Sequence, residues 1–141
     1  MWRKYFGGTN NDRSYDSIEN AEGDFILVGS SESSDNDISS PKGSYDIWVI
    51  KLTSNGDFLW ERSYGGSKYE TANSIIQSSD NKIHILGSTL NNDKDISFGM
   101  GSSDFWLITL DSNGNLLSEQ TFGGSNFDRG KKIEIDNKDN I

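Results

Sequence analysis

Two loops of the chain carry acidic and hydroxyl side chains at a spacing that could hold a metal ion. Each loop has Asp, Asp and Ser at every second position and ends on a further Asp. These residues are Asp35, Asp37, Ser39 and Asp46 in one loop, and Asp93, Asp95, Ser97 and Asp104 in the other. These oxygens occupy positions 1, 3, 5 and 12 of a twelve-residue stretch. A calcium loop surrounds its hard cation with oxygen ligands at the same positions. The eight residues are therefore candidate Ca²⁺ ligands.

The same residues have a simpler interpretation as turn caps. Position 6 is Ser40 in one loop and Phe98 in the other, where a helix–loop–helix calcium loop needs Gly, and the last ligand is Asp rather than Glu. Asp side chains also stabilise turns by accepting hydrogen bonds from nearby backbone amides. The turn role is the simpler prediction, and calcium binding remains the alternative.

Residues suited to catalysis are scarce. His84 is the only histidine and the chain has no cysteine, so a zinc site or a Ser–His or Cys–His nucleophile lacks partners. Pairs such as Asp35 and Asp37 could act as acid and base in glycoside cleavage. Their recurrence argues for scaffolding, because an active site is needed once whereas scaffold features repeat. By the same argument we expect Trp48 and Trp106 in the core, and we expect no catalytic or cofactor-binding residue here.

The charge of the chain limits its partners. Asp and Glu number 22 and Lys and Arg 13, which gives a net charge of −9. A phosphate-backbone binder needs a basic face, so we expect no nucleic-acid partner. The chain also has no apolar run of the roughly 18 residues needed to cross a bilayer, so we expect no membrane insertion.

The composition favours an all-β fold. Ser, Gly, Asp and Asn account for 66 of the 141 residues, whereas Ala occurs only twice. These four residue types disfavour helices, which excludes a helical bundle and a fold with long crossover helices.

The sequence repeats with a period of 58 residues. Residues 2–59 align with 60–117 without a gap and share 20 identities, and residues 118–141 begin the unit again. Each full unit contains four apolar runs separated by turn residues, which predicts four strands. The predicted strands are 15–20, 25–30, 46–52 and 58–64, and 73–78, 83–88, 104–110 and 116–122, with 2–6 as an additional fourth strand.

Four short strands in each repeat, with Trp and Gly at fixed places, are typical of a β-propeller blade. One small sheet cannot bury both of its faces, so blades stack on one another. We therefore predict that residues 1–141 form one segment of about 2.4 blades. A meandering β-sandwich is the alternative fold.

A family resemblance follows from these motifs. The chain contains Trp-x-x-x-(Tyr/Phe)-Gly-Gly-(Ser/Thr), a Gly-Ser strand, and Asp-x-Trp-(Val/Leu)-Ile-x-Leu-x-Ser-Asn-Gly. This pattern resembles the β-propeller repeats of secreted, Bacteroidetes-type bacterial proteins, which often precede a type IX secretion sorting domain. The third unit departs from it, with Ser118 in place of Trp. The resemblance implies an extracellular or cell-surface location.

The expected function is that of a non-catalytic scaffold that binds protein or glycan. The alternative is part of an extracellular, glycan-active enzyme whose site is formed by blades absent from this chain, and a structural spacer is a third possibility. Because 2.4 blades do not close a ring, the chain is expected to be a piece of a longer propeller or to associate with itself.

Overall fold

The computed structural model describes residues 2–141, whose regular structure consists of strands without a helix. The strands are β1 (Asp12–Glu19), β2 (Phe25–Ser31), β3 (Asp46–Leu52), β4 (Phe58–Tyr64), β5 (Glu70–Gln77), β6 (Ile83–Thr89), β7 (Asp104–Leu110) and β8 (Leu116–Phe122). Each strand from β5 to β8 begins and ends 58 residues after its counterpart. The predicted all-β fold is confirmed.

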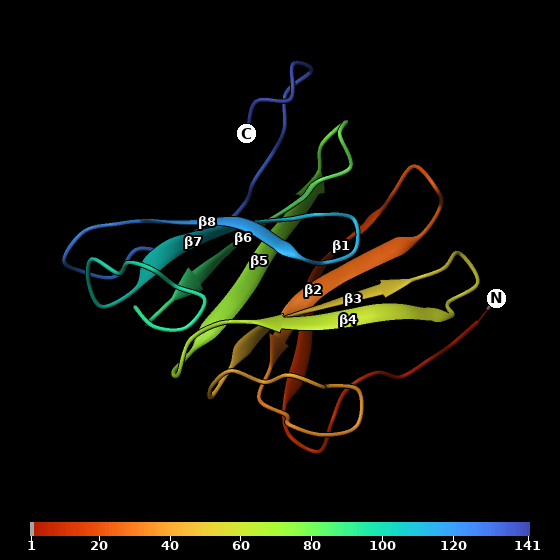
Figure 1. The fold of residues 1–141 in the computed structure, drawn as a ribbon, viewed down its shortest axis with the longest axis horizontal. Coiled ribbons are helices and arrows are strands. Elements are labelled where there is room, and N and C mark those ends of the chain that lie inside the picture. Colours follow the sequence, from red (N-terminus) through yellow and green to blue (C-terminus); the bar gives the residue numbers. More distant parts are fainter. Residues whose placement is uncertain (1) are drawn as a thin grey trace.

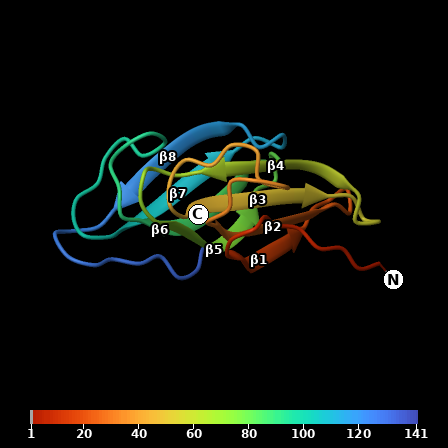
Figure 2. The ribbon, with the colours of Figure 1, turned by 90° about the horizontal axis from the view of Figure 1, so that it is seen from below.

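The strands form two antiparallel sheets with the simplest possible order. One sheet runs β1-β2-β3-β4 and the other β5-β6-β7-β8, each joined by hairpins. The sheets lie face to face in a fan, and β5 packs against β1, β2 and β3 (Figures 1 and 2). We call the edge where β1 and β5 meet the inner edge. The arrangement is that of two consecutive propeller-like blades.

The strand boundaries follow the sequence prediction closely except at the first strands. β1 and β5 begin at Asp12 and Glu70, three residues before their predicted starts. Residues 2–6 form no strand. A fourth strand pairs with the third strand of its own sheet. The described residues contain no third strand with which residues 2–6 could pair.

The core lies between the two sheets and is built mainly from buried residues of β2 to β7. Ile47 and Val49 of β3 are fully buried on the face towards the second sheet. Trp106 and Ile108 of β7 meet them from the other side, also fully buried. Burying one side chain of this size stabilises the fold by about 1.5–3 kcal/mol, so this face holds the blades together.

The opposite face of the first sheet carries a smaller cluster. Trp48, Ile50 and Leu52 alternate with the core residues of β3 and pack with Ile38. Trp48 is 6% exposed and Trp106 is fully buried, which confirms the prediction that both tryptophans are core residues.

The other two tryptophans, Trp2 and Trp60, pack on glycines in the hairpins. Gly56 adopts a φ of +78° and Gly114 a φ of +80°, the left-handed conformation that a tight hairpin requires and glycine adopts freely. A β-carbon on Gly56 would collide with the ring of Trp2, and one on Gly114 would lie 3.0 Å from that of Trp60. Each of these indoles, at the start of a 58-residue repeat, therefore covers the glycine of the hairpin near the end of the same repeat.

Glycine inside β2 and β6 shapes the inner edge. A β-carbon on Gly29 or Gly87 would overlap the carbonyl oxygen of Arg13 or Thr71 on the neighbouring strand. At these points β1 and β5 each contain a bulge, and Tyr15 and Asn73 are the residues left out of the pairing. A bulge turns its extra residue out of the ladder, so the two glycines determine where Tyr15 and Asn73 point.

This contact predicts that Gly87→Ala is strongly destabilising. The added methyl group would meet a backbone oxygen that cannot move without opening the β5–β6 ladder, so we expect a loss of about 2 kcal/mol or more in the free energy of unfolding. Gly124→Ala is the control, because its methyl group would come no closer than 3.8 Å to a neighbouring atom. Urea denaturation measures both. Equal stability of the two variants would contradict the role of Gly87.

Candidate functional site

Each Asp-rich loop faces one Gly-Gly turn, at residues 7–8 in the first unit and 65–66 in the second. The amide of Thr9 donates to Asp35 Oδ1 at 2.9 Å, and that of Gly7 donates to Asp37 Oδ2 at 2.9 Å. In the second unit, Ser67 N lies 2.9 Å from Asp93 Oδ1 and Gly65 N lies 3.1 Å from Asp95 Oδ2. These carboxylates therefore bind backbone amides of the Gly-Gly turns, 26 to 30 residues away, whereas the predicted turn role placed their partners nearby in the same loop.

A further carboxylate, four residues after the second glycine, completes each turn. The amide of Gly8 donates to Asp12 Oδ2 at 2.7 Å, that of Gly66 to Glu70 Oε2 at 2.7 Å, and that of Gly124 to Asp128 Oδ2 at 2.8 Å. Consecutive amides form a concavity that favours anions. Here the protein's own carboxylates fill it.

The other candidate calcium ligands lie elsewhere. Ser39 donates from its amide and its hydroxyl to Glu61, whose second oxygen accepts a hydrogen bond from Trp48 Nε1 at 3.0 Å. Ser97 donates from its amide to Glu119 in the same way. The structure thus keeps Ser39 and Ser97 apart from the carboxylates that face the Gly-Gly turns.

Asp46 and Asp104 bind the loop that precedes their own strands. Asp46 Oδ2 accepts from the amides of Lys42 and Gly43, and Asp104 Oδ2 accepts from that of Met100. The eight predicted residues therefore fall into three separate environments. Residues 2–141 contain no group of three or more His, Asp or Glu side chains that could hold a metal ion.

Two buried carboxyl groups meet at the junction of the blades. Asp46 is 2% exposed and Glu70 is fully buried. A β-carbon on Gly65 would lie 2.5 Å from Asp46 Oδ1 and 2.6 Å from Glu70 Oε2, so both carboxylates face the same glycine. Burial raises the pKa of Asp46 and that of Glu70, and the Asp46 charge raises the latter further. Within the described chain, Asp46 Oδ1 has no hydrogen-bond partner.

His84 is accommodated as a structural residue. It is 7% exposed, and its two ring nitrogens lie 3.1 Å from Ser78 Oγ and 3.0 Å from Thr109 Oγ1. Burial lowers the pKa of its imidazole. Both nitrogens already have hydroxyl partners, so His84 offers no free group for catalysis.

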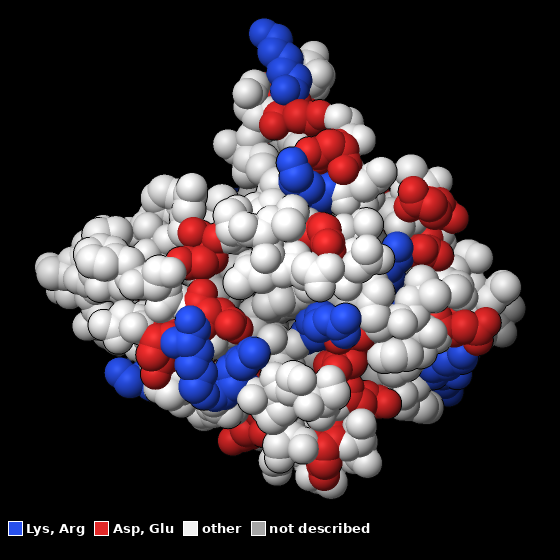
Figure 3. Space-filling model, viewed as in Figure 1, with Lys and Arg blue, Asp and Glu red and all other residues white. Residues whose placement is uncertain are grey.

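Charges on the surface are interspersed. On the face seen in Figure 3, Lys and Arg side chains lie among Asp and Glu side chains and form no continuous basic area. Residues 2–141 also contain no helix able to cross a membrane.

A cavity of about 360 Å³ opens at the inner edge, and we call it the inner cavity. It lies where three successive repeats meet, since its walls come from β1, from β5 and β6, and from the segment after β8. The lining residues are Tyr15, Tyr69, Thr71, Asn73, Ser88, Thr89, Leu90, Ser103, Phe127, Arg129 and Lys131.

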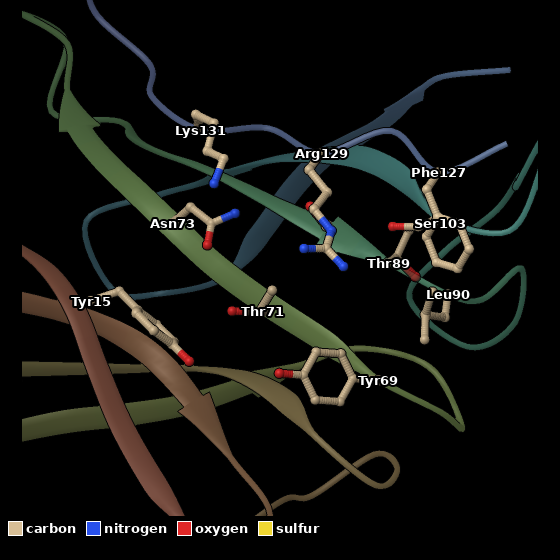
Figure 4. A pocket seen from close by; sticks show the side chains of 11 residues that line it. Tyr15, Tyr69, Thr71, Asn73, Thr89, Leu90, Ser103, Phe127, Arg129 and Lys131 are labelled. Carbon is tan, nitrogen blue, oxygen red and sulfur yellow. The ribbon is translucent and has the colours of Figure 1, made fainter.

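The segment after β8 is held against the second sheet by backbone contacts. The amide of Asp128 donates to the carbonyl of Ser103 at 2.8 Å, and Asn73 Nδ2 donates to that of Gly130 at 2.6 Å. Figure 4 shows the result: the side chains of Arg129 and Lys131 extend from this segment towards β5.

Tyrosines form the opposite wall. Figure 4 shows the hydroxyl groups of Tyr15 and Tyr69 on the far side of Thr71 from Arg129. The Tyr69 ring packs on Tyr45 with centroids 4.9 Å apart. Burial alone would raise the pKa of Tyr15, but hydrogen bonding with its neighbours Arg13 and Ser30 outweighs it and lowers the pKa.

The inner cavity was not predicted from the sequence, although a signal for it exists. Gly29 and Gly87 stand inside runs that otherwise read as strands, and a glycine in a strand often marks a bulge or a close backbone approach. That signal would have marked Tyr15 and Asn73 as bulge residues. No sequence pattern indicated that the third, partial repeat would close the cavity.

Comparison with protein-family models and with curated proteins found no match for this chain.

The turn role of the Asp-rich loops gives a first test. We expect Asp37→Ala to lower the free energy of unfolding by about 1.5 kcal/mol, since it removes a charged acceptor from the Gly7 amide. Ser34→Ala, at an exposed position of the same loop, is the control. Adding Ca²⁺ should leave the melting temperature of all three proteins unchanged. Calorimetric heat and a raised melting temperature in the parent and in Ser34→Ala, but not in Asp37→Ala, would instead support calcium binding.

The buried carboxyl at Asp46 gives a pH-dependent test. Because its pKa is raised on folding, the folded chain binds this proton more tightly than the unfolded chain, and stability falls as the pH rises through the folded pKa. Asp46→Asn removes the charge, so its melting temperature relative to the parent should rise between pH 4, near the ordinary pKa of Asp, and pH 8. Exposed Asp57→Asn is the control. A constant difference between pH 4 and 8 would contradict this prediction.

Proposed function

We propose that this chain is a non-catalytic binding module of an exported or cell-surface bacterial protein. Its propeller-like blades provide a rigid scaffold, and the inner cavity holds a small part of a larger ligand. The location is supported by the resemblance of the repeat to those of secreted bacterial proteins. Further blades, from the same polypeptide or another copy, are the proposed neighbours of the two outer faces.

The observation that carries this proposal is the loss of repeat symmetry in the inner cavity. Scaffold positions recur at intervals of 58 residues, as Asp46 and Asp104 do. The cavity position held by Tyr15 in the first unit is Asn73 in the second and Lys131 in the third. A scaffold needs the same contact at each junction, whereas a ligand is bound once and needs different groups around it.

The size and chemistry of the cavity favour a glycan as ligand. Its volume of about 360 Å³ lies at the lower end of the range typical of small-molecule sites, and it is too small to admit a folded partner. Hydroxyl and amide groups of Thr71, Asn73 and Ser103 stand beside the aromatic rings of Tyr15 and Tyr69. Such a mixture suits a sugar, which presents both hydroxyl groups and an apolar ring face.

A pair of aromatic substitutions tests the site. Tyr15 is 45% exposed in the cavity and Phe58 is 51% exposed at the start of β4. We expect Tyr15→Ala to weaken binding of glycans selected on an array by on the order of tenfold, because the ring contact is lost. Phe58→Ala should bind as the parent does. Surface plasmon resonance gives the affinities.

Two results would contradict the proposal. One is equal binding by Tyr15→Ala and the parent, which would place the ligand outside the inner cavity. The other is release of reducing ends from labelled polysaccharides that is lost in Tyr15→Ala, which would make the inner cavity a catalytic site.

A further inference from the structure

The inner cavity has an electrostatic character opposite to that of the chain. The chain carries 22 acidic and 13 basic side chains. The eleven residues that line the cavity include Arg129 and Lys131 and no Asp or Glu. The cavity is therefore positively charged in an acidic protein.

These two cations are available to a ligand. Among the described residues, neither Arg129 nor Lys131 forms an ion pair within 4.0 Å. Their neighbour Lys132 differs, since its ammonium lies 2.6 Å from Glu134 Oε1. Figure 4 shows the Arg129 guanidinium and the Lys131 ammonium directed towards β5 from the same wall.

Two acidic groups next in sequence to lining residues, Glu70 and Asp128, are engaged elsewhere. Glu70 is fully buried, and its oxygens accept hydrogen bonds from Gly66 N, Thr89 Oγ1 and Asn91 Nδ2. Asp128 Oδ2 accepts from the amide of Gly124. Neither carboxylate lines the cavity, so neither occupies the place of an anion bound there.

We infer that the inner cavity binds a carboxylated sugar residue of the uronic acid type within a glycan chain. The inference rests on the proposed function and specifies its ligand class. The planar guanidinium of Arg129 can bind a carboxylate through two parallel hydrogen bonds, and Lys131 adds a second positive charge. Tyr15 and Tyr69 pack on the sugar ring, while Asn73 binds a hydroxyl group.

The charge of the ligand is tested with a matched pair of probes. A tetramer of galacturonic acid and its fully methyl-esterified form have nearly the same shape but differ in charge. By titration calorimetry with the intact 141-residue chain, we expect the acid to bind at least on the order of tenfold more tightly, because hydrogen bonds to charged groups are lost in the ester. Raising the salt concentration should reduce the difference in affinity between the acid and the ester.

Three glutamine variants assign the charge to its residues. Arg129→Gln and Lys131→Gln should each weaken binding of the acid by on the order of tenfold and leave binding of the ester unchanged. Lys132→Gln makes the same change of charge next to Lys131 but outside the cavity, so it should bind as the parent does. Thermal melting checks that all three are folded.

The outcomes separate the inference from the proposed function. Equal or tighter binding of the ester overturns the inference and leaves a neutral-glycan site in place. Binding of poly-glutamate as tight as that of the acid overturns the glycan class. If neither these probes nor any arrayed glycan binds, the inference and the proposed function both fail.

Discussion

The structure depends on one repeated interaction, in which the backbone amides of each Gly-Gly turn donate to carboxylates. At the first complete junction, Gly65, Gly66 and Ser67 donate in succession to Asp95, Glu70 and Asp93. This interaction explains why so acidic a chain can fold with few ion pairs, since its carboxylates are neutralised by amide dipoles rather than by lysines. It also explains the glycines, because a side chain at residue 65 would meet two carboxylates at once. The cost is desolvation, visible as the raised pKa of Glu70.

A second close contact, between glycines inside β2 and β6 and the backbone of the neighbouring strands, shapes the inner cavity. Gly29 and Gly87 allow the carbonyls of Arg13 and Thr71 to approach, and the resulting bulges turn Tyr15 and Asn73 out of the ladder. The side chains on either side of the bulge stay with the core, as fully buried Ala72 and nearly buried Ser74 do. One strand therefore contributes to the packing between blades and to the cavity wall.

The sequence predicted the sheets well because their signals are local and repeated. Alternating apolar residues and the Asn-Gly turns depend on neighbours within a few positions, and the strands from β2 to β4 and β6 to β8 appear within one residue of their predicted bounds. The cavity depends on contacts of long range. Asn73 Nδ2 reaches the carbonyl of Gly130, 57 residues away, and nothing in the composition of either segment indicates that contact. The Asp loops lie between these cases: their turn role was foreseen, but not that their partners would be the Gly-Gly turns.

Repetition also explains where such a protein can acquire a binding site. Positions that serve the junctions are constrained in every unit, because losing one carboxylate leaves an amide turn unsatisfied. The cavity positions bear no such constraint: Tyr15 and Asn73 are the extra residues of equivalent bulges, and Lys131 holds the same repeat position in the third unit, but the three differ in charge and shape. Each unit therefore presents one variable side chain towards the same place. A ligand held there would contact a combination of successive units, so its recognition would depend on the order of the repeats and not on any one of them.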